Sequence, residues 1–324
     1  MRVVPAWVRA AATLSLVVVL SAVAALLVPA AATAASARPL AVLIGGLGSN
    51  IPSAATDPSG GDWEFVKRRL EAAGYEVFVA ATRPGAVGDR PPYAIDSASS
   101  DWVGSAQRLD RQLTAAGFKD RRLVLVGHSM GGLISRVYAK TWPDLQSGCR
   151  PLGLVQLSTP NEGSEAAGLA GMFPASEATK VLGNMADMAA FNAAYPNAER
   201  LPIYRIAGSY FPAAARAYLV QHATPALAAT LAAIDAVYGT AANDSVVTVA
   251  SVRGGPTAGW RGCATFRAVH ADSAWLGAYR ADAGCVLPYR TGKKAGAAID
   301  EQIMRKIILD VGAVAREAAK QRIR

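Results

Sequence analysis

Apolar runs of five to eight residues alternate with amphipathic stretches along most of the chain. Several of these runs end in glycine, and their length and continuity are typical of strands that are buried in a sheet. The predicted strands span residues 40–44, 75–80, 122–127, 152–158 and 201–208. A sheet covered on both sides is therefore the expected centre of the molecule.

Helix signals fill the intervals between the predicted strands. Asp62 and Asp101 stand where an N-cap is expected, before helices predicted over residues 63–73 and 102–116. A third helix is predicted over residues 131–140. Because strands and helices alternate, we expect βαβ units in one α/β domain, with a mostly parallel sheet and helices on both of its faces.

Two segments interrupt this alternation. Residues 211–240 are mostly alanine and leucine with few charges, and residues 163–200 are rich in alanine, glycine and methionine. Within the second segment, one apolar face of a short helix is predicted from Val181, Leu182, Met185, Met188 and Phe191. Both segments come late in the sheet, where a helical cap over a pocket can be inserted. Ordinary packing helices are the alternative.

The first 37 residues have the layout of a secretory signal peptide. Two arginines precede an apolar run over residues 10–28, and Ala35-Ser36-Ala37 fits the A-x-A pattern of a cleavage site. We expect a signal peptide over residues 1–37 and a secreted domain over residues 38–324, with cleavage after Ala34 as an alternative. Because the apolar run is long, an uncleaved membrane anchor is the competing interpretation.

The net charge is +9, and much of the excess lies near the C-terminus. The basic residues there are Arg290, Lys293, Lys294, Arg305, Lys306, Arg316, Lys320, Arg322 and Arg324. An anionic lipid surface would attract such a cluster transiently, but a solvated helix face explains it more simply. No aromatic residues are interleaved with these cations, so we expect no nucleic-acid partner.

The three cysteines are Cys149, Cys263 and Cys285. Export permits a disulfide. The nearer pair is Cys263 with Cys285, so these two are predicted to form the bond and Cys149 is predicted to stay free. No spacing indicates a zinc site.

Ser129 lies in Gly127-His128-Ser129-Met130-Gly131, which matches the pattern G-x-S-x-G. That pattern indicates a nucleophile only between a strand and a helix, and the predicted elements supply both. The glycines leave room for a sharp turn, and the start of the helix presents free N–H groups to the site. The alternative is a serine that merely caps the helix, but a cap does not need glycines on both sides.

These residues resemble the nucleophile turn of the α/β-hydrolase fold, as found in secreted bacterial esterases and triacylglycerol lipases. Three further stretches resemble parts of that family. AVLIGGLGS resembles the strand and loop that carry the oxyanion donor, STPNEGSEAAG resembles the loop after the next strand, and NDSVV resembles the loop that carries the acid. The resemblance implies an α/β-hydrolase domain over residues 38–324 with a helical cap, and a catalytic order of serine, acid and then histidine.

His270 is the histidine that fits this order. His222 precedes every plausible acid loop, and His128 adjoins Ser129 inside the turn, where neighbouring side chains point in different directions. Asp244 precedes His270 by 26 positions and is the favoured acid. The alternatives to it are Asp235 and Asp272, and Asn243 is a candidate to support the acid.

The resemblance also implies two backbone donors for the tetrahedral oxyanion. The residue after the nucleophile, Met130, supplies one N–H. Alignment to the family's HG-x pattern places the second at Leu47, with Gly45 where histidine usually stands. That histidine braces the loop, so its loss raises the question of what holds the loop here.

The sequence therefore predicts a secreted serine hydrolase that cleaves carboxylic esters, with lipid or acyl esters as substrates. Ser129, His270 and Asp244 would form an acyl-enzyme without a metal or organic cofactor. An acyltransferase of the same fold is the first alternative, because its chemistry is identical up to the acyl-enzyme. A non-catalytic envelope-binding protein is the second, although no catalytic position is missing. The sequence leaves the oligomeric state open.

Overall fold

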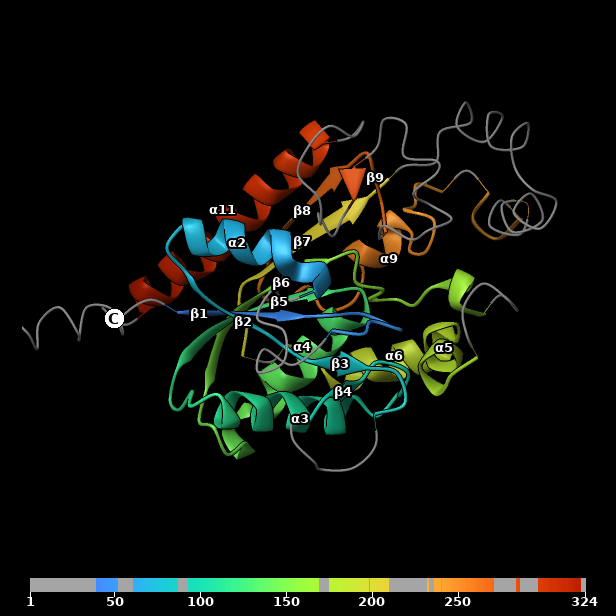
Figure 1. Ribbon diagram of the computed structural model, residues 1–324. Helices are drawn as coiled ribbons and strands as arrows, with labels where there is room; N and C mark the ends of the chain where they lie inside the picture. The colour runs from blue at the N-terminus through green and yellow to red at the C-terminus, as the bar shows by residue number, and fades with distance from the viewer. Residues whose placement is uncertain are drawn as a thin grey trace, which may run out of the picture. The chain divides into compact units, whose positions relative to one another are not determined.

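Six parallel strands in the order β2-β1-β5-β6-β7-β8 form the centre of the computed structural model (Figure 1). The strands are β1 (Leu40–Ile44), β2 (Glu76–Val79), β5 (Arg122–His128), β6 (Arg150–Leu157), β7 (Ile203–Gly208) and β8 (Trp260–Phe266). The first five coincide with the five predicted apolar runs, and β8 is the run that leads to His270. The predicted parallel α/β sheet is confirmed.

The structure describes residues 39–51, 61–86, 93–168, 175–197, 199–209, 232, 236–239, 241–270, 284–285 and 297–321. The chain divides into two units, Met1–Pro39 and Leu40–Arg324. The predicted signal peptide and most of the 211–240 segment lie outside the described residues. Among the helices that are described, none is long and apolar enough to cross a bilayer.

Helices cover both faces of the sheet (Figure 1). One layer consists of α3 (Trp102–Ala115) and α4 (Met130–Thr141), and the other of α2 (Glu64–Ala72) and α11 (Ala297–Gln321). The alternation of side chains along β1 divides the core accordingly. Leu40, Val42 and Ile44 pack with α3 and α4, while Ala41 and Leu43 pack with α2 and α11. On α11 the basic residues Arg305, Arg316 and Lys320 are exposed, as a solvated helix face requires, whereas Lys306 is half-buried and pairs with Asp310.

The two predicted N-caps have different outcomes. The Asp101 side chain accepts a hydrogen bond from the Gly104 N–H at 2.9 Å and caps α3 as predicted. The prediction for Asp62 is wrong, because Asp62 lies inside a short 3-10 turn, Gly61–Trp63, that leads directly into α2. Trp63 occupies the cap position there without a side-chain hydrogen bond.

The 163–200 segment holds two short helices where one was predicted, α5 (Glu177–Leu182) and α6 (Met185–Ala194). Asn184 separates them because its side chain accepts the Ala186 N–H at 3.0 Å and starts α6 anew. Leu182, Met188 and Phe191 are buried in the core shared with α3 and α4, whereas Met185 is 41% exposed. In the described residues of the 163–200 segment, α5 and α6 therefore pack on the core of the domain itself.

The predicted disulfide between Cys263 and Cys285 is wrong for this structure, because Cys263 carries a free thiol; Cys149 is free, as predicted, and buried. The strand register gives the reason. Cys285 lies in β10 (Gly284–Cys285), where it pairs with Val269 of β9 (Ala268–Val269), six positions beyond Cys263. An extended chain covers about 20 Å in six residues, and a disulfide requires Cα atoms within about 7 Å.

Candidate active site

Ser129 forms a strained turn between β5 and α4. Its backbone has φ 53° and ψ −127°, a conformation that costs energy for any residue other than glycine. The Ser129 N–H donates to the Leu157 carbonyl at 2.8 Å, so the neighbouring strand β6 holds the turn. Although Ser129 stands at the N-cap position of α4, its side chain makes no capping hydrogen bond. The structure therefore does not support the capping alternative.

The glycines around Ser129 allow the turn to pack against neighbouring backbone. A Cβ atom on Gly127 would lie 2.5 Å from the Gly131 carbonyl carbon, and one on Gly131 would lie 2.3 Å from the Ile44 oxygen. A Cβ on Gly46 would lie 2.7 Å from the Ser129 Cβ. The end of β1 is thus in close contact with the turn, and only glycine fits at these positions.

The structure brings His270 and Asp244 together. The Nδ1 atom of His270 lies 2.8 Å from Oδ2 of Asp244, and their side chains are 8% and 1% exposed. The two backbones are also joined, because the His270 N–H donates to the Asp244 carbonyl at 2.9 Å. With Nδ1 as the donor to the carboxylate, the neutral ring leaves Nε2 free to accept a proton.

Asp244 is held as a carboxylate. Burial alone would raise its pKa, but the charge of His270 and hydrogen bonds from His270, Ser158 and the Val247 N–H outweigh burial and hold the pKa below its usual value. The Oδ1 atom accepts the N–H groups of Val246 at 3.0 Å and Val247 at 2.7 Å. A buried charge with this many donors can orient a histidine and stabilise its protonated form.

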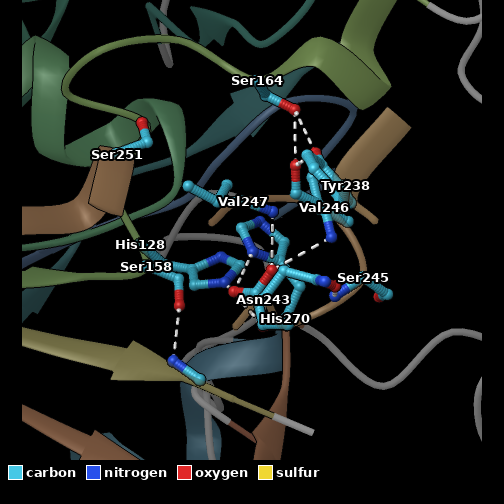
Figure 2. Close-up of polar contacts among 12 residues, drawn as sticks. His128, Ser158, Ser164, Tyr238, Asn243, Ser245, Val246, Val247, Ser251 and His270 are labelled. Atoms are coloured by element: carbon cyan, nitrogen blue, oxygen red, sulfur yellow. Dashed lines mark hydrogen bonds and ion pairs between the residues drawn. The ribbon is translucent and has the colours of Figure 1, made fainter. Parts of the chain in front are cut away.

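His128 supports His270 instead of acting as a base. Its Nε2 lies 2.9 Å from the His270 carbonyl oxygen, so Nε2 carries the proton and donates it. The two ring centroids are 4.7 Å apart, side by side in Figure 2. Burial and the nearby His270 lower the pKa of His128 to about 3, so the ring stays neutral. The contact places the end of β5, next to Ser129, beside His270.

We expect His128 to make the fold sensitive to acid. An unfolded histidine has a pKa of 6.5 and the folded His128 a pKa of about 3, so within this window the unfolded chain binds a proton that the folded chain excludes. The free energy of unfolding is unaffected above this window and falls inside it by up to about 1.4 kcal/mol per pH unit. Urea unfolding at pH 7 and pH 5 measures the slope. His128→Phe should reduce that slope even though it lowers stability overall, and equal slopes in the two proteins would contradict the assignment.

Three residues that received no role from the sequence brace the acid loop. Ser158, at the end of β6, hydrogen-bonds to Asp244 and also accepts the Gly208 N–H at 3.3 Å. Ser164 and Tyr238 both donate to the Val246 carbonyl at 2.5 Å, as Figure 2 shows. Ser158 is the last residue of a predicted strand that neighbours the nucleophile strand, and this position is the signal that could have identified it.

Asn243 stabilises the same loop from within. Its amide N–H donates to the Ala241 carbonyl at 2.8 Å, and its side-chain oxygen accepts the Ser245 N–H at 2.9 Å. It therefore shapes the turn that carries Asp244. The alternative candidates His222, Asp235 and Asp272 lie outside the described residues.

The two expected oxyanion donors belong to segments that adjoin Ser129. Met130 is the first residue of α4, and Leu47 follows Gly46, whose backbone lies against Ser129. In the described part of the chain, neither N–H donates a hydrogen bond to another protein atom. Free N–H groups at a helix start and on an adjoining loop suit a developing negative charge. Within the same residues, no cluster of three or more histidine, cysteine or acidic side chains could hold a metal ion.

No protein-family model matches the sequence, and no curated protein does. Solved structures do match. The metagenomic carboxyl esterase MGS0156 superposes with a TM-score of 0.51 at 18% identity, over 87% of this chain and 76% of that one. EstA from Clostridium botulinum gives a TM-score of 0.51 at 13% identity, over 85% of this chain and 87% of that one. At these identities the likeness concerns architecture alone. The superposition and the parallel sheet covered on both faces together show that this chain has the α/β-hydrolase fold.

Proposed function

We propose that this protein is a serine hydrolase that cleaves carboxylic esters. The observation that carries the proposal is the buried contact between Asp244 and His270, which His128, the residue before the strained turn at Ser129, joins through the His270 carbonyl. A serine, a carboxylate and a histidine in this chain order are the parts that acyl transfer requires.

The chemistry follows from the positions of these groups. Ser129 Oγ attacks the ester carbonyl while His270 Nε2 takes its proton, and the ionised Asp244 stabilises the imidazolium. The carbonyl electron pair moves to oxygen, where the N–H groups of Leu47 and Met130 stabilise it. His270 then protonates the departing alcohol. Water attacks the acyl-enzyme by the same steps and releases the acid.

Two arguments favour an ester over other acyl substrates. One of the matching structures is named a carboxyl esterase. Leu47, in the loop beside the nucleophile, is apolar and packs against the core cluster that includes Met130, and an apolar side chain there suits an acyl chain. We further propose that the protein acts outside the cytoplasm, after removal of residues 1–37, because of their signal-peptide pattern.

Hydrolysis of p-nitrophenyl esters with graded acyl chains tests this proposal. We expect turnover of the esters and far slower turnover of the matching p-nitroanilides, which have the same acyl groups and a poorer leaving group. Adding an alcohol acceptor separates hydrolysis from acyl transfer. Absence of ester turnover at every chain length would refute the proposal, and a product consisting mainly of transferred acyl groups would replace hydrolysis by transfer.

A further inference from the structure

The peptide bond between Gly46 and Leu47 joins the oxyanion donor to a carbonyl on the same rigid plane. Because a trans peptide is planar, its C=O and N–H point in opposite directions. The groups that hold the Gly46 oxygen therefore also set the direction of the Leu47 N–H. Whatever fixes that oxygen acts on the oxyanion site without touching the substrate.

Ser49 holds the Gly46 oxygen with two donors. Its Oγ donates to that oxygen at 2.7 Å, and its backbone N–H donates to the same oxygen at 3.2 Å. The Ser49 side chain also occupies the space beside Gly45, where a Cβ would lie 2.6 Å from Ser49 Oγ. A histidine at position 45, as in the family's pattern, would therefore collide with the group that replaces it.

The small sheet of β3 (Thr82–Arg83) and β4 (Ile95–Asp96) anchors Ser49 in turn. Ser49 Oγ lies 2.8 Å from Thr82 Oγ1. Because Ser49 uses its single hydroxyl proton on Gly46, Thr82 is the donor in this pair. Ser97, which follows β4, donates from its hydroxyl to the Ser49 carbonyl at 2.8 Å, and its backbone carbonyl accepts the Gly48 N–H at 2.9 Å. Thr82 and Ser97 are 1% and 0% exposed, so water does not compete for these bonds.

We propose that Ser49 is a positioning residue for the oxyanion. Through Gly46 it holds the Leu47 N–H towards Ser129, and Thr82 holds Ser49. It thus performs the bracing that the missing histidine at position 45 would perform. This inference rests on the proposed function, because it concerns a donor that acts only when a tetrahedral oxyanion forms.

Ser49→Ala tests the proposal in the full-length protein, with p-nitrophenyl butyrate as substrate. A trifluoromethyl ketone serves as the tetrahedral analogue: Ser129 Oγ bonds to its carbonyl carbon, the serine proton passes to His270, and the carbonyl pair becomes an oxyanion. We expect kcat to fall about tenfold and the Ki of the ketone to rise about tenfold, since one donor is misdirected without being removed. KM should stay within about twofold, because the ground-state ester needs the donor little.

Ser105→Ala is the matched control. Ser105 is 2% exposed, and its hydroxyl donates to the Asp101 carbonyl at 2.9 Å on α3, away from the oxyanion loop. It should leave kcat and Ki unchanged while losing a comparable hydrogen bond. If Ser49→Ala does not fold, Thr82→Val removes the donor to Ser49 and should lower kcat and raise Ki, whereas Thr82→Ser keeps a hydroxyl and should change both less.

The results separate this inference from the proposed function. Ester turnover that is equal in the original protein and in Ser49→Ala, with an unchanged Ki, overturns the positioning role alone. A change in KM without a change in Ki does the same. A protein without ester turnover overturns the proposed function and this inference together.

Discussion

Ser129→Ala is expected to lower kcat/KM for p-nitrophenyl butyrate by about 10⁴- to 10⁶-fold, because it removes the only atom that can form the acyl-enzyme. The fold should tolerate the change. The Ser129 side chain makes no capping hydrogen bond, and the strained turn is held by backbone bonds such as Ser129 N–H to Leu157 at 2.8 Å. Steady-state rates and the midpoint of thermal unfolding measure the two effects separately.

A matched control for this variant lies in α4, six residues beyond Ser129. Ser135 is fully buried, and its hydroxyl donates to the Gly131 carbonyl at 2.8 Å. Ser135→Ala should lose stability of the order of one hydrogen bond, about 1 kcal/mol, and retain turnover. If Ser129→Ala turned over the ester as fast as Ser135→Ala does, another group would have to be the nucleophile.

Asp244→Asn should lower kcat by about 10⁴-fold, because the amide presents a donor where His270 needs an acceptor. The carboxylate accepts from His270 Nδ1 at 2.8 Å. An amide nitrogen at that position would favour the tautomer with the proton on Nε2, and such a ring cannot take the proton of Ser129. Because asparagine and aspartate have the same shape, KM and the unfolding midpoint should change far less than kcat.

Asp235→Asn is the control that decides between Asp244 and the alternative acid that precedes it in the chain. It has the same chemistry and lies in the segment that leads to the Asp244 loop. We expect its kcat to remain near that of the original protein. A large loss in Asp235→Asn together with a small loss in Asp244→Asn would reverse the assignment of the acid.

The parts of the site that were predictable from sequence are those whose signals are local. The turn around Ser129 depends on glycines within two positions of it, and the cap at Asp101 depends on an N–H three residues away. His270 and Asp244 could be chosen because few candidates exist in the required order. Their contact depends on the fold, but the order of the chain already restricted the choice.

Asn243 was predicted as a support of the acid, but His128 and Ser49 were not predictable as supporting residues, because their contacts join distant segments. His128 reaches the His270 carbonyl across 142 positions, and Ser49 reaches Thr82 across 33. A serine or a threonine at such positions has no distinguishing pattern in the sequence. The prediction of a Cys263–Cys285 disulfide failed for a related reason. Two residues that are near each other in sequence need not be paired in the sheet, and Cys285 pairs with Val269 instead.

Covalent labelling shows whether Ser129 is the nucleophile. A fluorophosphonate loses fluoride when a serine oxygen attacks phosphorus, and the adduct can be located by peptide mass spectrometry. We expect a single adduct on Ser129 that forms in step with the loss of ester turnover and does not form on the unfolded chain. Complete inhibition with the adduct on another residue, or with Ser129 unmodified, would contradict it.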